Sequence, residues 1–294
     1  MTSEALKDAY TRSSTCANRL RLPLRSKVWR GGSGDFAGAG TGSSMDFQDH
    51  RNYVPGDDPR HINWQAYART GQYTMKLYRE EVRPVIDLIC DVSPSMFLDE
   101  TKSARTAQLL SFFTQSSLRA GASLTIHLVS GASHRLIPNE AVATHQWFTI
   151  AEKLQEEDSA GVLNLSSVPF RQSSFRVLLS DLLFPGDPAA ILHVLAARQG
   201  TPLLFAPFLE SEANPDWQGN YEFVDSERGT RHPHRIEPRV LKNYLKAYQR
   251  HFALWKNTSQ RLQILMSRVP ADLDLEKALY SCLLYTSPSP RDRG

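Results

Sequence analysis

From residue 85 onward, short apolar runs rich in branched residues alternate with stretches whose apolar residues recur at helical spacing. Such runs have the composition of buried strands, and the stretches between them have the period of amphipathic helices. Strands that alternate with helices favour a mostly parallel sheet with helices on both faces, so an α/β fold is predicted. The predicted strands cover residues 85–90, 123–129, 134–137, 175–180, 202–208, 221–224 and 262–266, and the predicted helices cover residues 103–118, 143–157, 188–198, 238–260 and 273–280.

Bulk properties narrow the class of protein. With 294 residues, 41% of them hydrophobic, the chain can bury a sizeable core. A net charge of +3 is too balanced to argue for a nucleic-acid partner. No run reaches the roughly 18 apolar residues of a membrane helix, and the first residues do not read as a signal peptide. Cys16 and Cys90 suggest no disulfide framework, so the cytoplasm is the simplest location.

Composition divides the chain into four parts. Residues 1–20 form a polar leader that we expect to be loose. Residues 21–82 form an N-terminal extension, which begins basic, continues glycine-rich and then becomes dense in aromatic and turn residues. Residues 83–281 carry the alternating pattern and form the main domain. Residues 282–294 resemble the translation of a transposase adapter used in DNA library preparation, so we interpret them as non-native.

Oxygen-bearing side chains follow two of the predicted strands. Asp91, Ser93 and Ser95 come directly after the strand at residues 85–90, and Asp181 follows the strand at residues 175–180. The carboxyl ends of parallel strands are where ligands bind in open α/β sheets. Carboxylate and hydroxyl oxygens suit Mg²⁺ better than zinc or copper. The competing explanation is that this motif only caps the helix that follows it.

The motif Asp91-x-Ser93-x-Ser95 resembles the metal-ion-dependent adhesion site of von Willebrand factor A domains. A longer segment, Arg51-Asn52-Tyr53-Val54-Pro55-Gly56-Asp57-Asp58-Pro59-Arg60-His61-Ile62-Asn63-Trp64, resembles the signature of the bacterial domain-of-unknown-function family fifty-eight. Ala68-Arg69-Thr70-Gly71 continues that resemblance, which spans nearly the whole chain before the adapter-like segment. The longer signature is the more specific of the two.

The resemblance implies a von Willebrand factor A-like, Rossmann-like domain preceded by an N-terminal extension. It also implies a protein partner, a MoxR-type AAA+ ATPase, and no established catalytic reaction. The implied metal is Mg²⁺ or Mn²⁺, held by Asp91, Ser93, Ser95 and Asp181. A-domains usually add a threonine from a loop between the two carboxylate strands, and the corresponding stretch here has none. Ser159 or Asn164 is the candidate substitute; otherwise water takes the place, or the site is weak or empty.

Two roles are open for the signature residues Tyr53, Pro55, Gly56, Asp57, Asp58, Arg60, Trp64 and Arg69: tying the extension to the main domain, or docking a partner. Pro55-Gly56 predicts a tight turn, because proline fixes φ and glycine permits positive φ at the next position. Asp57 and Asp58 are expected near Arg60 in an arginine–carboxylate network. Ile62, Trp64 and Tyr67 are expected to anchor the segment in the core.

Three functions remain open on the sequence. The leading hypothesis is a non-enzymatic interaction module with a divalent-metal site, working with an AAA+ ATPase in a chaperone-like role. The second is a metal-dependent phosphoester hydrolase using Asp91 and Asp181, although no histidine or lysine stands beside them in the motif as a base. The third is a structural scaffold with no metal.

Overall fold

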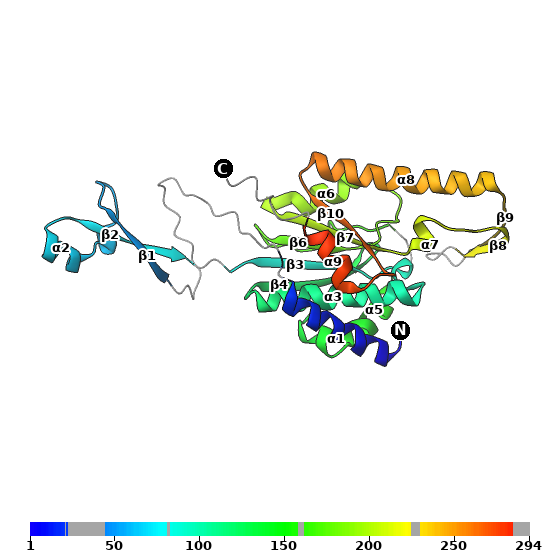
Figure 1. Cartoon of the computed structure of the whole chain (residues 1–294), viewed down its shortest axis with the longest axis horizontal. Helices are drawn as coiled ribbons and strands as arrows, with labels where there is room; N and C mark the ends of the chain where they lie inside the picture. Colours follow the sequence, from blue (N-terminus) through cyan, green and yellow to red (C-terminus); the bar gives the residue numbers. More distant parts are fainter. Residues whose placement is uncertain (21, 23–44, 81–82, 158–161, 225–229, 285–294) are drawn as a thin grey trace. The chain divides into compact units, whose positions relative to one another are not determined.

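The computed structural model describes residues 1–20, 22, 45–80, 83–157, 162–224 and 230–284 (Figure 1). The chain divides into two compact units. The larger unit joins Met1–Leu24 to Pro84–Gly294, and the smaller unit is Arg25–Arg83. The predicted main domain started at residue 83, and in the structure the larger unit also includes residues 1–24.

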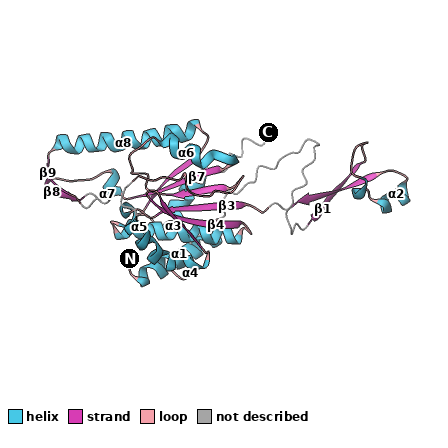
Figure 2. Ribbon diagram, turned by 180° about the vertical axis from the view of Figure 1, so that it is seen from behind, coloured by secondary structure: helices cyan, strands magenta, loops and turns pink. Residues whose placement is uncertain are grey.

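The larger unit is built on a six-stranded sheet, which confirms the α/β prediction (Figure 2). Its strands run in the order β10-β7-β6-β3-β4-β5, and all neighbouring pairs are parallel except β4 and β5. The strands are β3 (Val85–Asp91), β4 (Ser123–Ser130), β5 (Ser133–Ile137), β6 (Phe175–Leu179), β7 (Thr201–Phe208) and β10 (Leu265–Pro270). From β3 the chain continues to β4 and β5 on one side, and then returns to β6 on the other side of β3. The topological switch point therefore lies between β3 and β6.

Helices cover both faces of this sheet because side chains alternate along each strand. Leu88 belongs to the core under α1 (Ser3–Arg19), α3 (Glu100–Arg119), α5 (Gln146–Glu157) and α9 (Leu275–Leu284), with the short α4 (Glu140–Ala143) beside them. Its neighbour Ile89 belongs to the opposite core, under α6 (Pro188–Ala196) and α8 (Pro238–Arg261). Leu88 and Ile89 are both fully buried, with no exposed surface.

The prediction of a loose leader over residues 1–20 is wrong, because Ser3–Arg19 forms helix α1. Leu6, Ala9 and Cys16 are buried against α3, and the Ser13 hydroxyl donates to the Gln108 carbonyl at 2.8 Å. Small side chains allow the two helices to approach closely. A stripe of this kind adds little hydrophobicity, which is why the segment reads as polar and unstructured.

A buried polar network supports the amino end of the sheet. Asp87 in β3 accepts from Arg171 Nε and from the Ser174 hydroxyl, each at 2.7 Å. Arg176 in β6 donates to the carbonyls of Val194 and Leu195 at 3.0 Å, where α6 ends. The network fixes the base of β3 and β6, whose other ends carry the predicted site.

Two predicted elements differ in place. The predicted strand at 262–266 begins later, as β10, because the turn that ends α8 takes up Leu262 to Ile264: Gln263 has a φ of 56° and Ile264 N–H donates to Ser259 O. The predicted strand at 221–224 is not in the main sheet. It forms β8 (Gly219–Val224), paired antiparallel with β9 (Arg231–Ile236) in a separate hairpin. A short helix, α7 (Glu210–Ala213), lies between β7 and this hairpin along the chain.

The smaller unit holds the signature segment. Strands β1 (Met45–Asn52) and β2 (Thr74–Glu80) pair antiparallel, and between them lie a 3₁₀ turn (Pro59–His61) and helix α2 (Trp64–Thr70). Asn63 caps the start of α2 by accepting Ala66 N–H at 3.2 Å. Gly71, with a φ of 70°, ends it in the left-handed conformation that glycine favours.

Across the described ranges, no helix combines the length and apolar character needed to cross a bilayer.

Candidate metal centre at the carboxyl end of the sheet

Asp91 ends β3 at the topological switch point, and its carboxylate is almost fully buried. Its Oδ1 accepts the backbone N–H of Ser93 at 2.9 Å, and its Oδ2 accepts the hydroxyl of Ser180 at 2.6 Å. Ser180 is the residue between β6 and Asp181, so it ties the ends of the two central strands together. The sequence motif gives no sign of Ser180.

The hydroxyls of Ser93 and Ser95 lie 3.1 Å apart beside Asp91. Ser93 precedes a 3₁₀ turn (Pro94–Phe97) but makes no side-chain capping bond to it. Helix α3 is instead capped by Asp99, which accepts the N–H groups of Thr101 and Lys102. Helix capping therefore does not account for the two serines. At 3.1 Å the two hydroxyls hydrogen-bond each other, so among the described residues the partner of the Ser95 hydroxyl is Ser93.

Asp181 follows β6 and lies at the same end of the sheet, as predicted from its position after a strand. It is 3% exposed. Its Oδ1 accepts the Leu183 N–H at 3.0 Å, and its Oδ2 accepts the ammonium of Lys102 at 2.8 Å. Both oxygens are thus already engaged within the protein.

Besides Ser180, two charged residues of the site, Lys102 and Glu212, were not predicted from the sequence. Lys102 lies in the first turn of α3 and is 1% exposed, and its Nζ also donates to Glu212 Oε1 at 2.7 Å. Burial alone would lower the pKa of the Lys102 ammonium, but Asp181 and Glu212 outweigh burial, and its pKa lies above the usual value. Lys102 therefore contributes a fixed positive charge beside Asp181.

The electrostatics of the site favour a further cation. Burial and then the charge of Asp181 raise the pKa of Asp91 to about 6, against the opposing hydrogen bonds from Ser180 and Ser93. When ionised, the three carboxylates of Asp91, Asp181 and Glu212 and the one ammonium carry a net charge of −2. A divalent cation at Asp91, Ser93 and Ser95 would neutralise that charge. One carboxylate and two hydroxyls are the kind of donors that Mg²⁺ or Mn²⁺ takes, and Asp181 is held by Lys102.

The loop expected to supply the third ligand is only partly described. Ser159 lies outside the described residues. Asn164, the other candidate, is exposed, and its side-chain oxygen accepts the N–H of Ser166 at 2.9 Å in a local turn. Gln155 on α5 contributes in another way, since its Nε2 donates to the Val92 carbonyl at 2.6 Å and fixes the loop between Asp91 and Ser93. Considering only the residues described, no group of three or more His, Cys, Asp or Glu is arranged to hold a metal ion, so any site here depends on the serine hydroxyls.

The signature segment matches its predicted turn. Asp57 N–H donates to Val54 O at 3.0 Å around Pro55-Gly56, and Gly56 has a φ of 108°. The carboxylate of Asp57 is held by both terminal nitrogens of Arg51, at 2.6 and 2.8 Å. The expected network around Arg60 is therefore only half present, because Asp57 pairs with Arg51 instead.

Asp58 does pair with Arg60, at 2.7 Å. The predicted burial of Trp64 is wrong, since 56% of it is exposed. Ile62 is buried as expected. Tyr67 is half-buried and stacks on Tyr73 with ring centres 4.4 Å apart. Tyr53 packs beside the same Tyr73 ring, and the Arg69 side chain is exposed on α2.

Comparison with known proteins gives a family and several structural neighbours, among them two bacterial proteins. No curated protein matches the chain. An aerotolerance-related membrane protein from Bacteroides fragilis, solved with multiple mutations to serine, is 10% identical. It aligns with a TM-score of 0.33 over 61% of this chain and 100% of its own. The conserved hypothetical protein BatB from Bacteroides thetaiotaomicron is 11% identical, with a TM-score of 0.34 over 69% and 98% of the two chains.

The family match is broader and agrees with the signature read from the sequence. The model of the protein of unknown function DUF58 matches residues 49–253. That range starts in β1 and ends within α8, so it includes both the signature and the site at the ends of β3 and β6. The chain belongs to the DUF58 family.

Proposed function

We propose that this protein is a non-enzymatic interaction module that binds a partner protein at the carboxyl end of its sheet. A divalent cation, Mg²⁺ or Mn²⁺, would be held by Asp91, Ser93 and Ser95, as in an adhesion-type site of a von Willebrand factor A-like domain. The metal would supply an open coordination position for a carboxylate of the partner. Lys102 and Glu212 keep Asp181 in place and set the charge around that position.

One observation carries this proposal: the Ser93 side chain contacts the Asp91 carboxylate, the Ser95 hydroxyl lies 3.1 Å from the Ser93 hydroxyl, and Ser93 makes no side-chain capping bond. The net charge of −2 across the four ionised groups supports it further. The family resemblance suggests a MoxR-type AAA+ ATPase as the partner and a chaperone-like or complex-assembly role in the cytoplasm.

A binding experiment tests the proposal. The purified chain is immobilised and the MoxR-type AAA+ ATPase of the same organism is passed over it, with Mg²⁺ or with EDTA. We expect EDTA and Asp91→Ala each to weaken binding about tenfold or more. The control variant Asp216→Ala removes an exposed carboxylate outside the site and should bind normally. Equal binding by wild type, Asp91→Ala and the EDTA sample would rule out a metal bridge.

A metal-free scaffold is the second candidate, and one contact favours it. The Lys102 ammonium is 2.8 Å from Asp181 and already supplies a positive charge within the site. In this version the partner binds the same surface through the serine hydroxyls, while the buried Lys102 supplies the charge that balances Asp181 from within. EDTA would then have no effect, whereas Ser93→Ala and Ser95→Ala would still weaken binding. A hydrolase using Asp91 and Asp181 stays a prediction, tested by turnover of phosphoesters with Mg²⁺ or Mn²⁺.

A further inference from the structure

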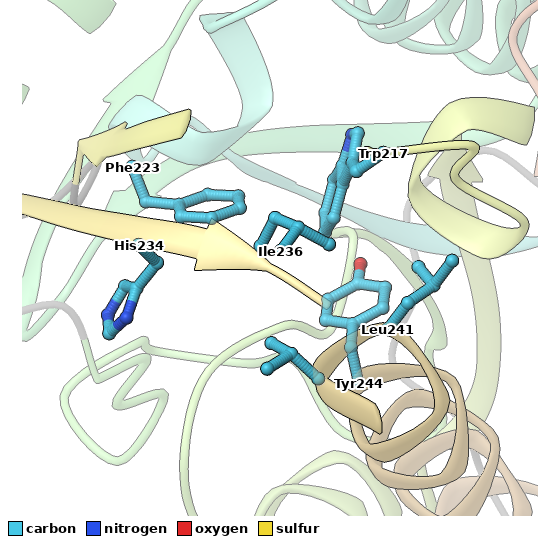
Figure 3. A pocket seen from close by; sticks show the side chains of 7 residues that line it. Trp217, Phe223, His234, Ile236, Leu241 and Tyr244 are labelled. Carbon is cyan, nitrogen blue, oxygen red and sulfur yellow. The ribbon is translucent and has the colours of Figure 1, made fainter. Parts of the chain in front are cut away.

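A second candidate surface lies where the β8–β9 hairpin meets the start of α8 (Figure 3). A cavity of about 270 Å³ opens there. Its walls are almost entirely apolar and come from three segments of the chain. They are formed by Trp217, Phe223, His234, Ile236, Val240, Leu241 and Tyr244.

Aromatic rings define the shape of this cavity. Trp217 packs against Tyr244 with ring centres 4.9 Å apart, and against Phe223 at 5.2 Å. In Figure 3 the rings of Phe223, Trp217 and Tyr244 surround a common space. Aromatic rings at these distances and angles pack favourably against one another, so the cavity is lined by a cluster of contacting rings. Val240 is 42% exposed and is accessible to a molecule that enters from solvent.

The elements around the cavity are strongly basic. Helix α8 carries six lysines and arginines and no acidic residue. All six side chains are exposed, and within the described part of the chain none of them forms an ion pair; they are Arg239, Lys242, Lys246, Arg250, Lys256 and Arg261. Residues 219–224 and 230–261 together hold eight cations and two anions, a net charge of +6. The whole chain has only +3, so positive charge is concentrated here.

The cavity is connected to the end of the sheet that carries the metal centre. The hydroxyl of Tyr244 donates to the Glu212 carbonyl at 2.8 Å, and the Glu212 carboxylate accepts from Lys102. The chain leaves β7 at the carboxyl end of the sheet and reaches the hairpin through α7, which contains Glu212. A partner seated at the metal centre and a segment seated in the cavity would therefore lie on the same end of the domain.

We propose that this cavity binds one large apolar side chain from an acidic segment of a partner protein, whose carboxylates contact the basic face of α8. The cavity is smaller than the roughly 300 Å³ at which small-molecule sites begin, and it suits a single aromatic or aliphatic anchor. A nucleotide base would lose hydrogen bonds to water against these walls, because they offer almost no polar atoms. The proposal does not require a metal at Asp91.

Short synthetic peptides test the proposal by fluorescence anisotropy, with the full chain and with EDTA present. One series is acidic with a central Trp, Phe or Leu; a second has Ala at the centre; a third keeps the anchor but replaces the acids by Lys. We expect at least one anchored acidic peptide to bind about tenfold more tightly than the Ala and Lys versions. Added salt should weaken this binding, because exposed charges are screened.

Matched variants locate the binding. Val240→Trp, which fills the cavity, and Val240→Asp, which makes it polar, should each weaken binding about tenfold. Leu254→Trp, on the same helix but outside the cavity and 49% exposed, should not. Lys246→Glu should weaken binding, whereas Lys153→Glu on α5, an exposed residue, should not.

Three results would overturn the proposal: no anchored acidic peptide binds better than the Ala version, both Val240 variants bind like wild type, or single-stranded DNA or anionic phospholipid vesicles bind more tightly than every peptide. Because EDTA is present throughout, failure here leaves the metal-bridge experiment unaffected. Conversely, if EDTA had no effect on binding of the AAA+ ATPase, the peptide result would not be affected.

Discussion

The Lys102 ammonium lies 2.8 Å from the carboxylate of Asp181, and both groups are almost fully removed from solvent. A buried pair of this kind is costly to break, because removal of one partner leaves the other charge without compensation. Here the pair also fixes the residue that its position after a strand predicts as a metal ligand. The organisation of the site thus depends on a lysine from the first turn of α3.

Replacing Lys102 should show how much the pair contributes to stability. Lys102→Met is expected to lower the free energy of unfolding by about 3–5 kcal/mol, since Asp181 would remain buried without its cation. Urea titration followed by circular dichroism measures this. Adding Asp181→Leu to Lys102→Met should recover part of the loss. As a control, Arg135→Met breaks the exposed pair with Glu157 and should cost less than about 1 kcal/mol. A similar small loss for Lys102→Met would contradict the buried pair.

Gly200 should tolerate no side chain. A Cβ at this position would stand 2.6 Å from both Arg176 Cζ and the Leu195 carbonyl oxygen, and Arg176 is held by its bonds to that same turn. Gly200→Ala is expected to destabilise the protein by about 3 kcal/mol through this overlap. Gly121→Ala meets no atom within 4 Å and is strained only by its φ of 67°, so it should cost about 1 kcal/mol. Thermal unfolding of the two variants makes the comparison, and equal losses would argue against the close approach.

His127 should make stability depend on pH. It is 1% exposed in β4, and neither ring nitrogen has a hydrogen-bond partner among the described residues. Burial lowers its pKa to about 4, with Asp87 opposing that change and His134 and Arg171 adding to it. The unfolded chain binds a proton below about pH 6.5 while the folded protein does not, so stability should fall as pH drops from about 6.5 to about 4.

The size of this loss of stability follows from the same pKa difference, and a variant without the histidine is the control. The loss should total about 3 kcal/mol in wild type. His127→Leu should remove this component, so its unfolding midpoint in urea should change less over the same pH range. If the difference in free energy of unfolding between wild type and His127→Leu stayed constant with pH, His127 would not be a neutral buried histidine.

Trp64 should matter little for stability despite its size. It is 56% exposed on α2, whereas Ile62, two residues earlier, is buried. Trp64→Ala should change the amide hydrogen-exchange rates of residues 45–80 only slightly. Ile62→Ala should lower the local free energy of unfolding by about 2–3 kcal/mol, so the same amides should exchange much faster. The opposite order would show that Trp64, and not Ile62, anchors the segment.

Much of the larger unit could be predicted from the sequence because its strands are apolar and its helices amphipathic. Asp91 and Asp181 were also predicted, since residues after parallel strands share one edge of the sheet. Lys102 was not, because a lysine in a helical pattern normally faces solvent, and its burial depends on carboxylates 79 and 110 positions away. Helix α1 was missed because its contact with α3 uses small and polar side chains such as Ser13.

The central claim is that Asp91, Ser93 and Ser95 hold a divalent cation, and calorimetric titration of the full chain with Mn²⁺ tests it most directly. One saturable site is expected in wild type, lost in Asp91→Ala and weakened about tenfold or more in Ser93→Ala, while Asp216→Ala binds as wild type does. The absence of saturable binding by wild type, or unchanged binding by Asp91→Ala, would contradict the metal centre and leave Lys102 as the cation of the site.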